Sequence, residues 1–491
     1  MLTFVIDSTA NTPLYQQIYE NIQNRILSGT LPAGAKLPST RSLASNLGIS
    51  RNTVDTAYYQ LQAEGYIDAA PKSGFYVCDN IPEELYSPRS TMISKENLLK
   101  TVDSQNTYEK TDSNPAKVPA YRYDFSPFAI DISHFPFSVW RKLYRQCLMD
   151  QQELFLLGNN LGDLSLRQAI CSYVQLSREV HCEPEQIIIG AGVDYLLQML
   201  SLVFEHLKLF NITLENPGYM QAAHIFRNNG LSIFSGFLDE KGLLVSSISP
   251  ESQIVYVTPS HQFPLGTVMP FGRRKELLAW ASTDSQRYII EDDHDSEFRY
   301  KGKPIPSLQG MDTNQRVIYI GTFSKAIAPA IRVGYMVLPP SLLSVYEKIC
   351  GEYSCTVSRL DQAILTHFLD NGYFEKHVNR MRKIYRNKHD LVLTCLQPLI
   401  KKYHLKIHGE NAGLHLVIEL SENGIPEEVL IQRAKKEGIH LYGIKEHYLT
   451  EKSSTDVQKM SGVLLGYSNL SEEEIKKGIC HMADTQIFES K

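Results

Sequence analysis

A single lysine stands among small residues in the stretch GTFSKAIAPAIRVGY, and its surroundings suggest a chemical role. Lys325 follows the apolar run RVIYIG, which has the pattern of a buried strand. A second such run, RYIIED, ends in Asp292, and a third, QIIIGAG, leads to Gly192 and Val193. In an open α/β sheet, ligands bind at the edge where the parallel strands end. The sequence therefore predicts an amine, a carboxylate and a glycine-rich turn in one site.

These groups match the needs of pyridoxal phosphate. That cofactor requires an amine to hold its aldehyde as a Schiff base, a carboxylate to keep its ring nitrogen protonated, and donors for its phosphate. The turn at Gly192 opens a helix whose N-terminus favours an anion, and Tyr219, in ENPGY, offers an aromatic face for the ring. The predicted catalytic residues are Lys325 and Asp292, and the predicted cofactor-binding residues are Lys325, Asp292, Tyr219, Gly192, Val193, Thr322, Ser324 and Arg332.

Each of these residues also has a plainer interpretation. A lysine after a strand is usually solvated, and an aspartate there often caps a helix. The run EDDHDSE could hold a metal ion, but side chains on extended backbone alternate faces, so Asp292 and Asp293 cannot both reach one ion without a sharp turn. The run also lacks the glycine of a calcium loop, and the eight cysteines lack the CxxC spacing of a zinc site. We therefore expect no metal.

A large sheet must position the lysine and its partners, and the chain beyond residue 120 has the pattern for one. Helices alternate there with the apolar runs QIIIG, NITLE, LSIFSG, QIVYVT, RYIIED and RVIYIG. Such runs are buried on both faces, as in a mostly parallel sheet flanked by helices. From about residue 350, AGLHLVIEL, IHLYGI and a capping box at Ser471 and Glu474 indicate a smaller α+β part. Residues 121–491 are therefore predicted to form an α/β domain with a smaller C-terminal subdomain.

Residues 12–78 have a different pattern, that of a small helical domain. A helix is expected over 14–28, followed by two shorter helices, TRSLASNLG and RNTVDTAYYQLQAEG, which Ser39 and Ser50 can cap. Two short helices joined by a tight turn form a helix-turn-helix, and YIDAAPKSGFYV then has the pattern of a hairpin. The sequence predicts a winged helix, joined by a polar linker at 79–120 to the larger domain.

The third helix of this domain carries polar side chains suited to DNA. An inward stripe from Val54 to Leu61 leaves Arg51 and Asn52 facing outward near the helix start, where a recognition helix reads the major groove. On helix pattern alone, a merely solvated surface is an equal alternative. The predicted DNA-contacting residues are Ser39, Thr40, Arg41, Ser50, Arg51, Asn52, Thr53 and, from the wing, Lys72.

The composition is that of an ordinary globular protein, with 43% hydrophobic and 21% charged residues. The formal net charge of -5 excludes a generally basic nucleic-acid-binding protein, so any DNA contact must come from a local surface. No apolar run is long enough to cross a bilayer, and the N-terminus lacks the pattern of a signal peptide. We expect a cytoplasmic protein with reduced cysteines and no membrane contact.

Two resemblances to known families rest on these motifs. LPSTRSLA and SRNTV resemble the second and third helices of GntR-type winged-helix regulators. TFSKAIAPAIRVGY, EDDHDSEFRY, VTPSHQFPLGTVMP and ENPGY resemble fold-type I aminotransferases, and the order of the two halves is similar to that of the MocR/GabR regulators. The resemblance implies that Lys325 forms the internal aldimine, Asp292 pairs with the pyridine nitrogen, Arg332 holds the phosphate and Tyr219 stacks on the ring. It also implies a homodimer with shared active sites.

The sequence departs from the family pattern at three positions. His294 stands where the family commonly has a tyrosine that bonds the cofactor's phenolic oxygen, and it is counted among the predicted cofactor-binding residues. Leu157, in LGNNLG, stands where a tyrosine would reach the neighbouring subunit's phosphate. Leu464 stands near the position of an arginine that binds the substrate carboxylate in aminotransferases.

The predicted function is that of a transcription regulator that depends on pyridoxal phosphate, binds a double-stranded DNA operator and senses a small amino compound through the aldimine at Lys325. An active aminotransferase with an accessory DNA-binding domain is the alternative, and a domain that has lost its cofactor and serves only as a dimerisation scaffold is a third. We do not expect a turnover enzyme, although a partial transamination is compatible with the residues present. Without an arginine for the substrate carboxylate, repeated turnover lacks its orienting clamp.

Overall fold

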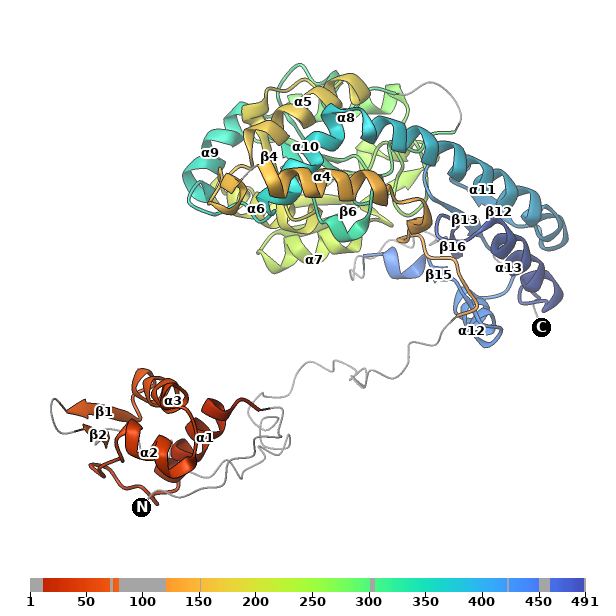
Figure 1. Ribbon diagram of the computed structural model, residues 1–491. Helices are drawn as coiled ribbons and strands as arrows, with labels where there is room; N and C mark the ends of the chain where they lie inside the picture. Colours follow the sequence, from red (N-terminus) through yellow and green to blue (C-terminus); the bar gives the residue numbers. More distant parts are fainter. Residues whose placement is uncertain are drawn as a thin grey trace, which may run out of the picture. The chain divides into compact units, whose positions relative to one another are not determined.

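The computed structural model describes residues 12–70, 74–78, 121–150, 152–300, 305–421, 424–449 and 460–489. The chain divides into two compact units, Met1–Asn114 and Pro115–Lys491 (Figure 1). The linker predicted at 79–120 and the wing residue Lys72 lie outside the described residues. In the part of the chain that the structure describes, no helix combines the length and the apolar character needed to span a membrane.

The smaller unit contains three helices and a hairpin, in the order expected of a winged helix. These elements are α1 (Leu14–Leu27), α2 (Thr40–Leu47), α3 (Arg51–Ala63), β1 (Ile67–Ala70) and β2 (Gly74–Val77). The two strands pair antiparallel. Apolar side chains at helical spacing form the core and are fully buried: Ile18, Ile22, Ile26, Leu43, Val54, Ala57 and Leu61.

The two helix starts in this unit are built differently. The Ser39 hydroxyl accepts a hydrogen bond from the Ser42 N–H at 3.2 Å and so caps α2, as predicted. Ser50 precedes α3 but makes no capping hydrogen bond with its side chain, which corrects the expectation that it caps this helix. The reason is local: the Thr53 N–H, which such a cap would bind, donates to the Ser50 carbonyl at 3.2 Å.

The larger unit is built on an eight-stranded sheet in the order β4-β11-β10-β9-β8-β5-β6-β7. The central strands β10, β9, β8, β5 and β6 are all parallel, and β11 runs antiparallel to both of its neighbours. This arrangement confirms the predicted mostly parallel sheet. The strands span β4 (Ile187–Gly190), β5 (Asn211–Asn216), β6 (Ser232–Asp239), β7 (Gly242–Leu243), β8 (Ile254–Val257), β9 (Tyr288–Asp292), β10 (Val317–Thr322) and β11 (Gly334–Val337).

Helices cover both faces of this sheet (Figure 1). Successive strand residues face opposite layers: Ile188 packs with α6, α7 and α9, whereas Ile187 and Ile189 pack with α4, α5 and α10. The strands are therefore apolar throughout, because each is buried on both sides. The helices are α4 (Phe137–Asp150), α5 (Leu164–Arg178), α6 (Val193–His206), α7 (Met220–Asn228), α8 (Phe271–Ser282), α9 (Pro340–Cys350) and α10 (Arg359–Asp370).

A smaller antiparallel sheet, in the order β12-β13-β16-β15, follows the long helix α11 (Tyr373–Tyr403). The capping box predicted at Ser471 and Glu474 is present at the start of α13. The remaining elements are β12 (Lys406–His408), β13 (His415–Glu419), α12 (Glu427–Lys436), β15 (Tyr442–Gly443), β16 (Gly462–Gly466), α13 (Glu472–Asp484) and the parallel pair β3 (Tyr123–Asp124) and β14 (Ile439–His440).

A buried ion pair ties α11 to the start of the larger unit. Lys388 Nζ lies 2.7 Å from Asp131 Oδ2 and also donates to the Ser468 carbonyl at 2.8 Å. We expect Lys388→Met to lower the free energy of unfolding by about 3–5 kcal/mol, because it leaves a buried carboxylate without its cation. Denaturant unfolding followed by circular dichroism measures the change.

The matched control is Lys406→Met. Lys406 Nζ lies 3.2 Å from Glu419 Oε1, but the lysine side chain is exposed. Exposed pairs contribute at most about 1 kcal/mol, so this variant should unfold close to wild type. Equal unfolding curves for the two variants would contradict the structural role assigned to Lys388.

Candidate functional site

Asp292 is the last residue of β9, and its carboxylate is buried at the edge where the parallel strands end. The Tyr256 hydroxyl, from the neighbouring strand β8, donates a hydrogen bond to Asp292 Oδ2 at 2.5 Å. Burial raises the pKa of Asp292 to about 6, and this hydrogen bond opposes the rise. The carboxylate is therefore ionised at neutral pH, as a partner for a protonated ring nitrogen must be.

Lys325 lies just beyond the end of β10, the strand beside β9. Its Nζ donates to the Pro127 carbonyl at 2.7 Å and lies 6.0 Å from the centre of the Phe128 ring. Burial lowers the pKa of the Lys325 ammonium, and the Asp295 carboxylate opposes that change. A lysine with a lowered pKa exposes more of its nucleophilic, neutral form at neutral pH.

The turn between β10 and Lys325 is organised by a hydrogen bond of its own. Thr322 ends β10, and its hydroxyl accepts a hydrogen bond from the Ser324 N–H at 2.9 Å. Both residues are half-buried. The structure therefore brings Thr322 and Ser324 to the same edge of the sheet as Lys325, as the sequence predicted.

A helix start and an arginine meet at a third point of the site. Gly192 precedes α6 with a φ of 90°, and Val193 is the first residue of that helix. Arg332 Nη2 donates to the Ala191 carbonyl at 3.3 Å and lies 3.6 Å from Asp194 Oδ2. A Cβ on Gly192 would lie 2.7 Å from Arg332 Nη2, so the guanidinium can approach only because this residue is glycine. Free N–H groups and a cation here suit an anion.

Tyr219 lies between the Asp292 carboxylate and the Arg332 guanidinium. It precedes α7, and its hydroxyl donates to Asp194 Oδ1 at 3.3 Å. Burial raises the pKa of the Tyr219 phenol, the charges of Asp194 and Asp292 raise it further, and Arg332 opposes them. Tyr219 therefore lies near both the carboxylate of Asp292 and the guanidinium of Arg332.

The three departures from the family pattern occupy different environments. His294 is mostly buried, and its Nε2 lies 3.7 Å from Asp295 Oδ1, beside Lys325. Leu464 is fully buried in an apolar cluster with Phe263. Leu157 is 91% exposed on the surface of this chain.

The predicted DNA-contacting residues lie at the starts of α2 and α3. Ser39, Arg41, Ser50, Arg51 and Asn52 are exposed, and Thr53 is half-buried. Arg51 Nε lies 3.4 Å from Asp55 Oδ2. Thr40 is only 7% exposed, so its side chain packs inside the fold and offers little surface to a ligand.

Sequence reasoning missed several groups at the sheet edge. Tyr256 was treated only as part of a buried strand, although strand alternation places its side chain where it can reach Asp292. Asp295, which influences the pKa of Lys325, follows the predicted Asp292 in the same run. Pro127 gives no signal, because its contribution is a backbone carbonyl from a segment far from Lys325 in the sequence.

Two family models match the chain. Residues 14–77 match the bacterial regulatory proteins of the gntR family. Residues 129–463 match aminotransferase class I and II. The first match covers the described winged helix, and the second covers the eight-stranded sheet and the smaller sheet as far as the start of β16.

Known proteins with both parts are similar over nearly their whole length. The HTH-type transcriptional regulator YdeL of Bacillus subtilis is 41% identical, over 97% of this chain and 98% of that protein. The probable rhizopine catabolism regulatory protein MocR of Rhizobium meliloti is 32% identical, over 97% of this chain and 94% of that protein.

Among solved structures, the multiple substrate aminotransferase of Thermococcus profundus has a TM-score of 0.67 at 24% identity, over 80% of this chain and 96% of that one. This likeness shows the fold of the larger unit. Together with the two family matches it confirms the resemblance expected from the motifs. The chain belongs to the MocR-type transcription regulators, in which a gntR-family helix-turn-helix domain is joined to an aminotransferase class I and II domain.

Proposed function

We propose that this transcription regulator binds pyridoxal phosphate in its aminotransferase domain and senses a small amino compound there, while its winged helix binds a double-stranded DNA operator. The observation that carries the proposal is the position of Asp292 and Lys325 after two adjacent parallel strands. Arg332 and the start of α6 supply an anion cradle at the same edge. These are the groups that the cofactor requires.

Pyridoxal phosphate, when bound, supplies an aldehyde that condenses with amines and a ring that withdraws electrons. Lys325 would hold the aldehyde end, because burial lowers the pKa of its amine. Asp292, ionised at neutral pH, would accept a hydrogen bond from the protonated ring nitrogen and so keep it protonated. Tyr219 would cover the ring face, and Arg332 with the N–H groups of α6 would hold the phosphate.

The wall of the site supports sensing rather than turnover. Leu464 is fully buried in a cluster with Phe263, Leu265, Val417 and Ile444, and by the resemblance it stands near the position of a carboxylate-binding arginine in aminotransferases. An amino compound can still compete for the aldehyde, but a substrate carboxylate lacks a bidentate partner at this position. The alternative, an active aminotransferase, uses the same lysine and aspartate, so the first experiment below separates the two.

Lys325→Ala should abolish covalent cofactor binding. We expect the purified wild-type protein to have a visible absorbance band from the cofactor, and borohydride should fix the cofactor to Lys325. The variant should lack the band and the adduct, because no other amine was predicted at the sheet edge. Absorbance spectroscopy and peptide mass analysis after reduction measure this. Lys348→Ala, at an exposed position on α9, is the matched control and should keep the band.

The same preparation distinguishes sensor from enzyme. An amino acid that shifts the band once, with no recovery when a keto acid is added, supports sensing. Repeated recovery with the keto acid supports the aminotransferase alternative. A wild-type protein without any trapped adduct would contradict the proposed cofactor.

Cofactor retention should depend on pH through Asp292. The pKa of this carboxyl is about 6, so the ring nitrogen loses its ionised partner, and the cofactor is released, as the pH falls through that value. Tyr256→Phe removes a hydrogen bond that lowers this pKa, so its release midpoint should move up by about one pH unit. Equilibrium dialysis between about pH 5 and 8 measures how much cofactor the wild type and the Tyr256→Phe variant retain at each pH.

Tyr319→Phe is the matched control for this shift. The Tyr319 hydroxyl donates to Asp293 Oδ2 at 2.6 Å, so the variant removes an equivalent hydrogen bond from the neighbouring carboxylate. Its release midpoint should stay at the wild-type value. A midpoint that moves equally in both variants would show general disturbance of the sheet edge rather than a role for Asp292.

Arg51→Ala should weaken binding to a DNA site selected from random sequences by about 1–3 kcal/mol, because the exposed guanidinium at the start of α3 can contact a base edge with two hydrogen bonds. Lys72→Ala should instead weaken binding to all DNA sequences alike. It should also lower the salt dependence of binding by the equivalent of about one phosphate contact. Fluorescence anisotropy at several salt concentrations measures both. Equal binding of selected DNA by wild type and Arg51→Ala contradicts this orientation of α3.

We also propose that the protein is a homodimer, so that its two winged helices bind two half-sites of one DNA operator. Large apolar side chains are exposed on and after α4, at Phe137, Met149, Phe155, Leu156 and Leu157. A surface of this kind supports burial against another chain. Sedimentation of the same sample should give the dimer mass, and a monomer with a single half-site would argue against it.

A further inference from the structure

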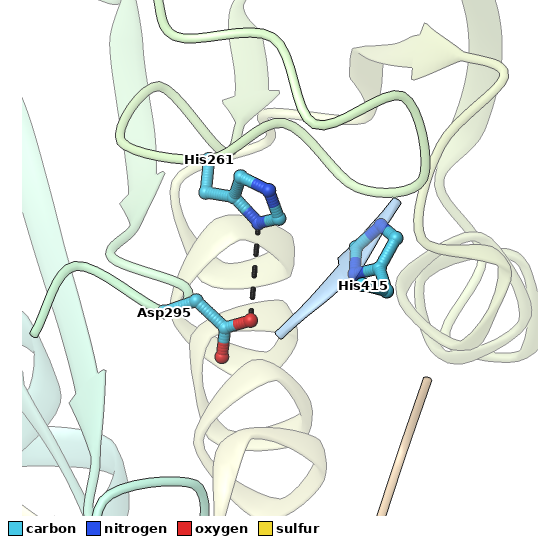
Figure 2. Close-up of side chains that lie close together, drawn as sticks. All are labelled: His261, Asp295 and His415. Carbon is cyan, nitrogen blue, oxygen red and sulfur yellow. Dashed lines mark ion pairs between the residues drawn. The ribbon is translucent and has the colours of Figure 1, made fainter. Parts of the chain in front are cut away.

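Three ionisable side chains from distant parts of the larger unit meet in its interior, and Figure 2 shows their arrangement. His261 follows β8, Asp295 follows β9, and His415 begins β13 of the smaller sheet. All three are buried, and each can place one nitrogen or oxygen atom within 4.8 Å of the others. His261 Nδ1 lies 3.8 Å from Asp295 Oδ2. We call these three residues the histidine cluster.

Polar atoms of the histidine cluster lack hydrogen-bond partners. Among the described residues, both ring nitrogens of His261, Nδ1 of His415 and Oδ1 of Asp295 are buried without one. A buried polar atom left unpaired costs about 1–3 kcal/mol. Folded proteins pair nearly all such atoms, so this concentration of four indicates a missing partner.

The orientation of His415 shows what kind of partner is missing. Its Nε2 lies 2.8 Å from the Pro264 carbonyl, which can only accept, so Nε2 carries the proton and donates. Nδ1 is therefore unprotonated and presents a lone pair to the cluster. Metal-binding histidines are commonly held in this way, with one nitrogen donating to a backbone carbonyl and the other free to bind the ion.

The side-chain types of the cluster also suit a cation. Two imidazoles and one carboxylate form a ligand set typical of divalent transition metals.

Close backbone contacts restrict the His261 ring. A Cβ on Gly413 would lie 2.0 Å from His261 Cε1, and a Cβ on Gly266 would lie 3.1 Å from His261 Nε2. Both positions also have positive φ, which favours glycine. The ring therefore has little room to turn away from Asp295, and its unpaired nitrogens stay inside the protein.

We propose that His261, Asp295 and His415 bind a divalent transition-metal ion, with zinc as the probe and the fourth position left to water. Ligand atoms at about 2.0–2.2 Å from zinc lie about 3.4 Å apart. The ligand atoms of the cluster lie within 4.8 Å of one another, so binding requires a contraction of at most about 1.4 Å. The run EDDHDSE contributes one ligand to this site, Asp295. Asp292 and Asp293 do face apart, towards Tyr256 and Arg178, and neither belongs to the cluster.

Metal analysis of the full chain tests the proposal. The purified protein is treated with a chelator, dialysed against micromolar zinc and then against buffer, and its zinc content is measured by elemental analysis. We expect about one zinc ion per chain. X-ray absorption should show nitrogen and oxygen ligands at about 2.0–2.2 Å without sulfur at about 2.3 Å. A sulfur shell would assign the ion to cysteine, such as the exposed Cys480, and would overturn the proposal.

Variants locate the ion. Asp295→Asn and His415→Gln should each weaken zinc binding by more than about 10-fold. Loss of a residue that only hydrogen-bonds to a metal ligand already costs about that much in affinity, and these two variants remove ligands themselves. The matched control is His377→Gln: this histidine is also buried, with Nε2 3.0 Å from the Ala326 carbonyl and Nδ1 unpaired among the described residues, but it lies outside the cluster. His377→Gln should retain zinc.

Two outcomes would overturn the proposal independently of these variants. A wild-type chain that retains no zinc would show that water or nothing fills the cluster. Equal zinc retention by Asp295→Asn, His415→Gln and His377→Gln would place the ion elsewhere. If a cluster variant fails to fold, as circular dichroism would show, the ligand shell of the wild-type protein decides the question.

Discussion

The candidate site depends on the parallel pairing of β8, β9 and β10. Parallel strands that are buried on both faces end at one edge of the sheet, so residues far apart in the chain are brought together there. Tyr256 comes from the first of these strands and Asp292 from the second, and Lys325 follows the third. Few of the contacts within the site join residues that are close in sequence. The order of the strands in the sheet brings the others together.

The sheet edge also separates three adjacent carboxylates by giving each a different partner. Asp293 accepts from Arg178 at 2.7 Å, and Glu291 lies 3.6 Å from Arg274. Among the described residues, the hydrogen-bond partner of the Asp292 carboxylate is the neutral Tyr256 hydroxyl. Strand alternation produces this difference, since neighbouring residues face opposite layers. Asp292, the carboxylate without a cationic partner among the described residues, is therefore the one that faces the candidate site.

Sequence reasoning reached the features that depend on local pattern. The winged helix, the mostly parallel sheet and the family follow from hydrophobic periodicity and short motifs, and they are confirmed. The roles of Lys325 and Asp292 stay predictions. The histidine cluster could not be predicted, because His415 lies in the smaller sheet and Asp295 in the turn after β9 of the large sheet, and no spacing in the sequence indicates that contact. The missing cap at Ser50 depends on a competing backbone hydrogen bond that composition does not reveal.

The hydrogen bond from Lys325 to the Pro127 carbonyl links the site to the first segment of the larger unit. That segment also contacts the smaller sheet, where the Gly466 N–H donates to Phe125 and the Ser468 hydroxyl donates to Ala129. Any group that captures the Lys325 amine competes with Pro127 for it. Capture of the Lys325 amine and its hydrogen bond to Pro127 are therefore linked equilibria, in which each changes the other by the same free energy. In sequence, this segment directly follows the stretch that leads back to the DNA-binding domain.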